Sequence, residues 1–361
     1  MILSVVGVVF ALGLIIFIHE LGHFLACRWL GIRVEEFALG FGKKLWYKKH
    51  GDTEYQLRAI PFGGFVKPAG EFFPSENTKH KPDEFCTQPW YKKLIMVLSG
   101  SAMNYVLAFL IFTSLIFFMG KPATDFQNAT TKIGDIAIDY PAYQAGIKAG
   151  DTILSVNGQS VDKWIEMAGL IHKTQGDVNI TYQHNNEIKK VAITPQIDNT
   201  TQNAIIGIAP HFVYEKIGLV GSVQAGAYQC WFWTYYSLKT LATKIYKKEK
   251  VDLAGPVGIV TMISKAVHKG FADYMAFIGL ISVAIGMFNL FPIPILDGGH
   301  AVFFMIEGIR RKRVPEKVVE KASMVGLTLL VGLLIFATYN DVIRMKKPNK
   351  KQEIEVVETG K

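Results

Sequence analysis

Two histidines and a glutamate lie inside the apolar N-terminal run of the chain, in the order His19-Glu20-Leu21-Gly22-His23. On a helix, residues four apart project from one face, so both imidazole rings can reach one metal ion. Glu20 lies one residue further round the helix, where a carboxylate can serve as a general base. The spacing therefore predicts the H-E-x-x-H site of a zinc hydrolase.

The apolar surroundings strengthen this interpretation. Apart from Glu20, no Asp, Glu, Lys or Arg stands before Arg28. An ionisable side chain at membrane depth costs at least about 2.5 kcal/mol, so three within one turn need a shared partner. A divalent metal ion is the simplest such partner. The alternative, that both histidines only bond backbone carbonyls of a buried helix, leaves Glu20 unexplained.

A third metal ligand is expected from residues 288–300, whose sequence is FNLFPIPILDGGH. Pro292 and Pro294 cannot continue a regular helix, so the chain should extend just before Asp297. Catalytic zinc commonly has three protein ligands and one open position, and Asp297 completes that set with the histidine pair. Two alternatives stay open: Asp297 as a turn or helix N-cap residue, and His300 as a rival ligand.

Composition restricts the class of protein. The chain has 361 residues, of which 50% are hydrophobic, and a formal charge of +9. These values fit a multi-pass membrane protein with a sizeable polar insert. Three scattered cysteines are too few for a disulfide framework or a cysteine zinc site. The basic residues flank apolar segments, as the positive-inside rule expects, so no nucleic-acid partner is predicted.

The hydropathy pattern predicts four transmembrane helices, an N-terminus outside, and the His19 end of the first helix near the cytoplasm. The expected segments are a first span (1–30), a cytoplasmic-side loop (31–93), a second span (94–119), an outer soluble domain (120–210), an outer interfacial helix region (211–272), a third span carrying LDGG (273–300), a cytoplasmic loop (301–323), a fourth span (324–341) and a polar tail (342–361).

The loop over residues 31–93 contains three short runs that alternate like strands, at 37–42, 54–60 and 62–66. An unpaired edge of such strands could hold an extended peptide by strand addition, although an ordinary cytoplasmic hairpin is an equal alternative. In the second span, the amide of Asn104 either braces a neighbouring helix or lies near the site.

The outer segment 120–210 resembles a PDZ domain of bacterial periplasmic proteases, through Ile133-Gly134-Asp135-Ile136 and the run 141–158. Such an α+β domain receives peptides as an added strand or by their C-terminal carboxylate. The apolar run 217–238 carries no charge, but a span there would put the next apolar helix on the wrong side. Its aromatic cluster, followed by lysines, instead predicts a helix lying in the outer membrane interface.

As a whole, the sequence resembles the site-2 protease family of intramembrane zinc metalloproteases, and in particular its RseP-type bacterial members. The resemblance rests on the motifs already quoted, together with Gly40-Phe41-Gly42, Glu54-Tyr55, residues 61–67, Gly255-Pro256-Val257-Gly258-Ile259 and residues 289–299. It implies a multi-pass fold with a membrane-associated β-hairpin and one PDZ domain.

The resemblance also implies residue roles. One zinc ion would be bound by His19, His23 and Asp297, with Glu20 as the catalytic base and Asn289 near the scissile peptide. Gly40, Phe41 and Gly42 would belong to a membrane-dipping hairpin that meets the substrate as a strand. Asn104, Pro292 and Pro294 are carried over more weakly; relatives often have Gly-Pro where this chain has Gly100-Ser101.

The implied activity is that of a metalloendopeptidase of the bacterial inner membrane, acting in regulated intramembrane proteolysis and stress response. Its substrates would be single-pass membrane proteins already trimmed by a first protease, such as an anti-sigma factor or a remnant signal peptide. The PDZ domain would be periplasmic and would bind peptides, with the active site toward the cytoplasm. Many relatives have two PDZ domains, whereas this chain has one.

Two other classes are considered. A PDZ-bearing membrane scaffold with inert catalytic parts is disfavoured by the intact set of two histidines, an aspartate and a glutamate. A metal transporter should show further ligands along a path through the bilayer, and the other spans offer almost none.

Overall fold

The chain forms two compact units, of which one combines Met1–Phe117 with Gly218–Lys346 and the other contains Phe118–Ile217. The computed structural model describes residues 2–70, 81–122, 129–138, 140–174, 176–197, 203–211, 213–247 and 255–346. Most of the predicted polar tail, from residue 347 onward, lies outside these described residues.

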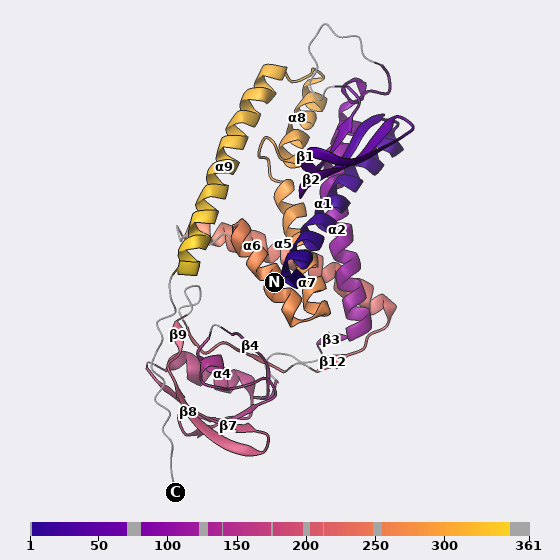
Figure 1. Cartoon of the computed structure of the whole chain (residues 1–361). Helices are drawn as coiled ribbons and strands as arrows, with labels where there is room; N and C mark the ends of the chain where they lie inside the picture. Colours follow the sequence, from indigo (N-terminus) through magenta and orange to yellow (C-terminus); the bar gives the residue numbers. More distant parts are fainter. Residues whose placement is uncertain are drawn as a thin grey trace. The chain divides into compact units, whose positions relative to one another are not determined.

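Within the described residues, four helices are long and apolar enough to cross a membrane, in agreement with the predicted number. They are α1 (Ile2–Leu30), α2 (Trp90–Met119), α7 (Phe271–Asn289) and α9 (Glu316–Lys346) (Figure 1). α2 and α9 begin before the predicted residues 94 and 324. The reason is that helical structure continues through polar flanking turns that hydropathy assigns to loops.

A separate helix, α8 (Asp297–Arg310), stands where the sequence analysis expects the end of the third span and a loop over 301–323. α7 ends at Asn289, and the prolines of the following segment interrupt the helix before α8 begins. α8 is stabilised by one apolar face, because Ala301 and Phe304 are buried in a cluster with Cys27. The predicted cytoplasmic loop is therefore largely helical.

The predicted strands of the 31–93 loop form a single folded-over sheet, made of β1 (Val34–His50) and β2 (Thr53–Pro68). Phe37 pairs with Val66 on one side and with Tyr55 on the other, and the far half of β1 returns along the outer side of β2. The segments thus lie side by side in the order 64–68, 34–39, 53–57 and 46–50. Residues 64–68 form one outer edge.

Glycines bend these strands instead of ending them. Gly40 and Gly42 have φ of +86° and +83°, and Gly63 has φ of +118°. This region of backbone space favours glycine because it has no Cβ. These glycines therefore allow β1 and β2, of 17 and 16 residues, to bend sharply and continue, where the sequence predicted separate short strands.

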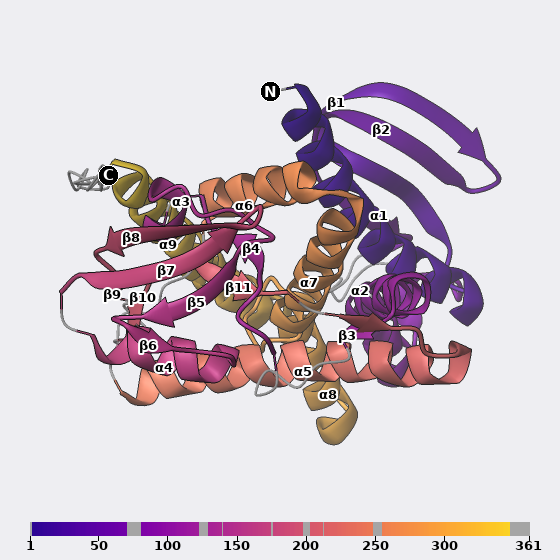
Figure 2. The same cartoon turned by 90° about the horizontal axis from the view of Figure 1, so that it is seen from below.

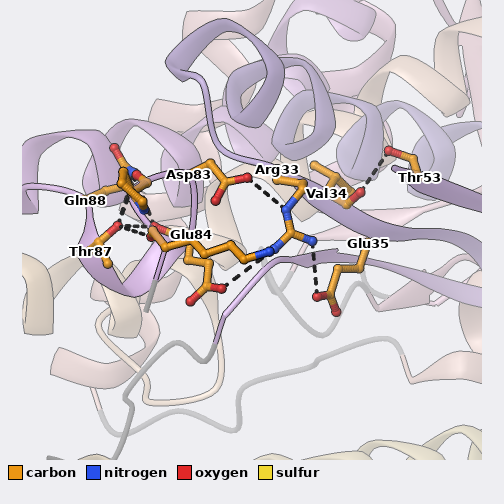
Figure 3. Close-up of polar contacts among 10 residues, drawn as sticks. Arg33, Val34, Glu35, Thr53, Asp83, Glu84, Thr87 and Gln88 are labelled. Carbon is orange, nitrogen blue, oxygen red and sulfur yellow. Dashed lines mark hydrogen bonds and ion pairs between the residues drawn. The ribbon is translucent and has the colours of Figure 1, made fainter. Parts of the chain in front are cut away.

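The start of β1 is tied to the segment that follows β2 (Figure 3). The Arg33 Nε donates to Asp83 Oδ2 at 2.9 Å, and the guanidinium also lies 3.7 Å from Glu35 and from Glu84. The hydrogen bond to Asp83, with the nearby carboxylates, raises the pKa of Arg33. The backbone N–H of Ala69 donates to the Arg33 carbonyl, so the end of β2 is held at this cluster.

Two helices, α5 (Leu219–Tyr246) and α6 (Pro256–Lys269), run across the direction of the long helices (Figures 1 and 2). α5 contacts α2 and α7: the Tyr105 hydroxyl lies 2.9 Å from the Thr234 hydroxyl, and Cys230 is buried beside Phe112 and Val283. α5 is not among the candidate spans found in the described residues. Its position in the outer interface stays a prediction.

The N-terminus of α6 is capped by a side chain from α9. Asp341 is buried, and its carboxylate accepts hydrogen bonds from the backbone N–H groups of Gly255 and Gly258, at 3.2 and 2.7 Å. A Cβ at Gly255 would lie 2.6 Å from this carboxylate, so the approach requires glycine. The Gly255-Pro256-Val257-Gly258 motif thus joins α6 to α9.

The second unit is a small α+β unit built around a four-stranded sheet of order β6-β5-β7-β8. Asn185 and Asn186, both at positive φ, form the turn between β7 and β8. Helix α4 packs its buried residues on the core of this unit. The main elements are β4 (Ile133–Ile136), α3 (Pro141–Gln144), β5 (Thr152–Val156), β6 (Gln159–Ser160), α4 (Trp164–Lys173), β7 (Val178–His184) and β8 (Glu187–Ile193).

Short strands complete the second unit. β4 pairs with β11 (Ile208–Pro210), β9 (Gln196–Ile197) pairs with β10 (Ala204–Ile205), and β3 (Lys121–Pro122) pairs with β12 (Tyr214–Glu215). The last pair joins the two ends of this insertion. The unit therefore has its own sheet and its own buried core.

Candidate metal centre

His19 and His23 lie one turn apart on α1 and bring their Nε2 atoms within 3.2 Å of each other. The Nδ1 of His23 lies 2.8 Å from the Met96 carbonyl of α2. Because a carbonyl can only accept, Nδ1 carries the proton and Nε2 keeps its lone pair. The helix contact thus selects the tautomer of His23 that can bind a metal.

Two glycines allow α1 and α2 to approach closely at this level. A Cβ at Gly22 would lie 2.4 Å from the Ser99 carbonyl oxygen, and a Cβ at Gly100 would lie 2.3 Å from His23 Nε2. Small residues at such contacts are typical of packed membrane helices. Gly100 therefore supplies the space that the two imidazole rings occupy.

Asp297 is the first residue of α8, and its carboxylate points at the histidine pair. Its Oδ2 lies 3.2 Å from His19 Nε2 and 3.6 Å from His23 Nε2. The N-cap position of α8 is Leu296, with no side-chain capping bond, so Asp297 is not the N-cap. Oδ2 is also buried and accepts no hydrogen bond within the described structure.

These three residues fit a metal ion. Their ligand atoms, two imidazole nitrogens and one carboxylate oxygen, all lie within 4.8 Å of one another. A buried carboxylate oxygen without a hydrogen-bond donor is costly, and a cation held between it and the imidazoles would remove that cost. Two His and one acidic ligand form a set that catalytic zinc uses, with a fourth position left open.

Glu20 faces the same cavity of about 290 Å³ as the three candidate ligands. Val66, in the edge segment of β2, lines the same cavity. Gly64 lies close to Glu20, because a Cβ there would lie 2.9 Å from Glu20 Cγ. The cavity is thus bounded by a helix that carries the ionisable groups and by the outer edge of the folded-over sheet.

Two asparagines flank His19. The Asn104 Nδ2 of α2 lies 3.3 Å from its Nδ1, and the Asn289 Nδ2 at the end of α7 lies 3.5 Å from its Nε2. The Asn104 side chain is fully buried and its Oδ1 lacks a partner in the described structure. Exchanging the amide oxygen and nitrogen would let Oδ1 accept the Nδ1–H of His19, which leaves Nε2 free for a metal.

The segment between α7 and α8 is tightly folded. Ile295 has φ of +98°, an outlier for a β-branched residue, and it lines the cavity beside Asp297. A Cβ at Gly299 would lie 2.3 Å from the Ile293 carbonyl oxygen, so the chain doubles back onto the first turn of α8. Pro294 packs against Gly326 of α9. Pro292 and Pro294 thus shape the segment without lining the cavity.

Other predicted residues lie elsewhere. Gly40, Phe41 and Gly42 form the bend of β1 and are not among the cavity-lining residues, whereas residues 64–66 are. The predicted peptide loop 133–136 is strand β4 of the second unit. His300 lines the cavity, but its Nδ1 lies 3.2 Å from the Leu296 carbonyl and it is not part of the three-ligand cluster.

Comparison with known proteins shows similarity along nearly the whole chain. A family model described as peptidase family M50 matches residues 7–333. A protein of Clostridium acetobutylicum with the provisional name zinc metalloprotease is 34% identical over 344 residues, which cover 94% of this chain and 97% of that protein. Proteins of Clostridium perfringens and Mesorhizobium japonicum with the same provisional name are 33% and 32% identical, over 92% and 94% of this chain and 96% and 98% of their own lengths.

Similarity to solved structures includes a small part of the chain. The PDZ domain of an SdrC-like protein from Listeria innocua matches at 26% identity, with a TM-score of 0.22. The match covers 24% of this chain and 99% of that domain.

Proposed function

Because this chain belongs to peptidase family M50, we propose that it hydrolyses peptide bonds within the transmembrane segments of single-pass membrane proteins. It is a zinc metallopeptidase of the site-2 protease type. One observation carries the proposal: His19, His23 and Asp297 converge beside Glu20, on or next to helices that are able to span a membrane. A hydrolytic centre in that setting can act on peptide bonds that soluble proteases do not reach.

His19, His23 and Asp297 would hold a single zinc ion. When bound, zinc polarises the scissile carbonyl and lowers the pKa of water. Glu20 would take the proton from the attacking water and return it to the leaving amine. Asn289, one hydrogen-bond length from His19, would orient the scissile peptide beside the ligands. Asn104 would act through His19, by fixing its ring orientation.

The substrate must be unwound before cleavage, because a regular helix bonds its own carbonyls internally. Residues 64–66 form an outer sheet edge beside Glu20, which supports a substrate segment bound there as an added strand. Gly40, Phe41 and Gly42 would serve this binding through the bend that folds the sheet and supports that edge. Pro292 and Pro294 would hold the opposite wall through the loop before Asp297.

The second unit would be a periplasmic PDZ domain that binds peptides at strand β4, formed by Ile133, Gly134, Asp135 and Ile136. With α5, it would admit only substrates that a first protease has trimmed, such as an anti-sigma factor or a remnant signal peptide. The enzyme would then act in regulated intramembrane proteolysis during stress response. It would lie in the bacterial inner membrane, with its active site toward the cytoplasmic side.

The test uses purified full-length protein and a single-pass model substrate that lacks its outer domain. The wild type is compared with Glu20→Gln and with Glu187→Gln, which makes the same chemical change at an exposed position of the second unit. We expect cleavage within the membrane segment by the wild type and by Glu187→Gln only, with about one zinc per chain in all three. Cleavage by Glu20→Gln at the wild-type rate would refute the role of Glu20.

A further inference from the structure

A second cavity, of about 400 Å³, lies between the first turn of α2 and the last turn of α8. It shares no lining residue with the cavity of the metal centre. Its walls include Trp90 of α2, Glu307 and Gly308 of α8, and the residues that follow α8, Arg311, Lys312 and Arg313. The described function makes no use of this cavity.

The charged side chains of this cavity that have no partner in the described structure are positive. Glu307 is neutralised by the buried Lys93, whose Nζ lies 3.0 and 3.2 Å from the two carboxylate oxygens. Arg313 donates to the Cys86 carbonyl at 3.0 Å. Arg311 and Lys312 are exposed and have no hydrogen-bond or ion-pair partner in the part of the chain that the structure describes. Two free cations therefore face the cavity.

Two further features favour an anion here. α2 begins at Trp90 with no acidic residue in its first turn, so the positive end of a 30-residue helix lies at the cavity. The Trp90 indole is packed on Gly308, where a Cβ would lie 2.5 Å from the ring, and the residue is still 40% exposed. The indole thus forms a fixed, accessible wall beside the cations.

The position of the cavity at the ends of two candidate spans indicates which anion fits it. Trp90 is the first residue of one candidate span, and the loop with Arg311 and Lys312 ends just before another, at Glu316. Tryptophan at the end of a span is typical of the headgroup level of a bilayer. Phosphate groups of lipids lie at that level, and arginine and lysine bind them through charge-assisted hydrogen bonds.

We infer that this cavity binds the phosphate headgroup of an anionic phospholipid. Arg311 and Lys312 contact the phosphate, and the positive end of the α2 helix dipole attracts it. The Trp90 indole packs on the glycerol region. The alternative is that these charges only set the orientation of the chain in the membrane, by the positive-inside rule. That role needs neither a cavity nor selectivity among lipids.

The experiment titrates short-chain phosphatidylglycerol into the full-length protein in an uncharged detergent and counts bound lipid by native mass spectrometry. Short-chain phosphatidylcholine and inorganic phosphate are titrated in parallel. The test variant is Arg311→Ala with Lys312→Ala, and the control is Arg310→Ala with Lys317→Ala. The control removes the same charge from exposed residues that do not line the cavity.

We expect the wild type and the control to bind phosphatidylglycerol in preference to phosphatidylcholine, and the test variant to bind it about 30-fold more weakly. Equal binding of the two lipids by the wild type would overturn the inference without reference to any variant. It is also overturned if the control loses as much binding as the test variant, which would indicate diffuse charge. Displacement of the lipid by inorganic phosphate at similar concentration would assign the cavity to free phosphate instead.

Discussion

Replacing Gly100 by alanine is expected to disable the metal centre while favouring the helix that carries residue 100. A Cβ at this position would lie 2.3 Å from His23 Nε2, 2.7 Å from His23 Cε1 and 2.8 Å from His19 Cε1. Ordinary contact starts near 3.4 Å, so the imidazole of His23 has to move by about 1 Å. The ring cannot simply swing aside, because its Nδ1 is bonded to the Met96 carbonyl.

The size of the expected loss follows from the small displacement of a ligand that a metal site tolerates. Ligand distances in such sites hold to about 0.2 Å, so a displacement of about 1 Å removes a ligand. Misplacement by that distance typically costs about 100-fold in rate. In contrast, alanine in place of glycine in a helix interior favours the helix by about 1 kcal/mol. Loss of activity with an unchanged or raised melting temperature would therefore locate the defect at the centre.

The assay measures zinc content and the rate of cleavage within the substrate's membrane segment. The matched control is Gly13→Ala in α1, where an added Cβ meets no atom within 4 Å. We expect Gly100→Ala to lose zinc and about 100-fold in rate, and Gly13→Ala to keep both. Wild-type zinc content and rate in Gly100→Ala would show that the ligands do not need the space beside this glycine.

Three further outcomes are expected. Asp297→Ala should lower zinc content from about one per chain in a protein that still folds, as measured by metal analysis after gel filtration, because one of three ligands is lost. Glu307→Leu should destabilise the protein by about 3–5 kcal/mol, since it leaves Lys93 buried without its partner, and adding Lys93→Met should restore most of that loss in denaturant unfolding. Ile153→Ala, at a fully buried position of the second unit, should cost about 2–5 kcal/mol of that unit's stability without changing zinc content.

Local patterns in the sequence were sufficient to predict the part of the candidate site that lies on α1. The i, i+4 spacing of His19 and His23 needs only a helix, and hydropathy alone indicated four spans. Asp297 is far from the two histidines in the sequence, so no local pattern relates it to them. It was predicted from the number of protein ligands that catalytic zinc commonly has. The prolines before it correctly indicated that the helix stops there.

What the sequence did not reveal depends on contacts between distant segments. Gly100 and Met96 support the histidines through the packing of α2 on α1, and no local pattern marks that contact. Residues 64–66 border the cavity because both β1 and β2 bend back on themselves. The resulting strand register depends on bends at glycine residues and not on strand propensity. The helix α8 was missed because its apolar face is short and follows two prolines.

The position of Asp297 in the chain has a consequence for biosynthesis. The three candidate ligands come from α1 and from the first turn of α8, so most of the chain must be made before they can meet. During synthesis the histidines enter the membrane long before their carboxylate partner exists. With the proposed ligand set, the nascent chain would lack a complete metal site until α8 packs on α1 and α2, and proteolytic activity would be withheld until these helices have assembled.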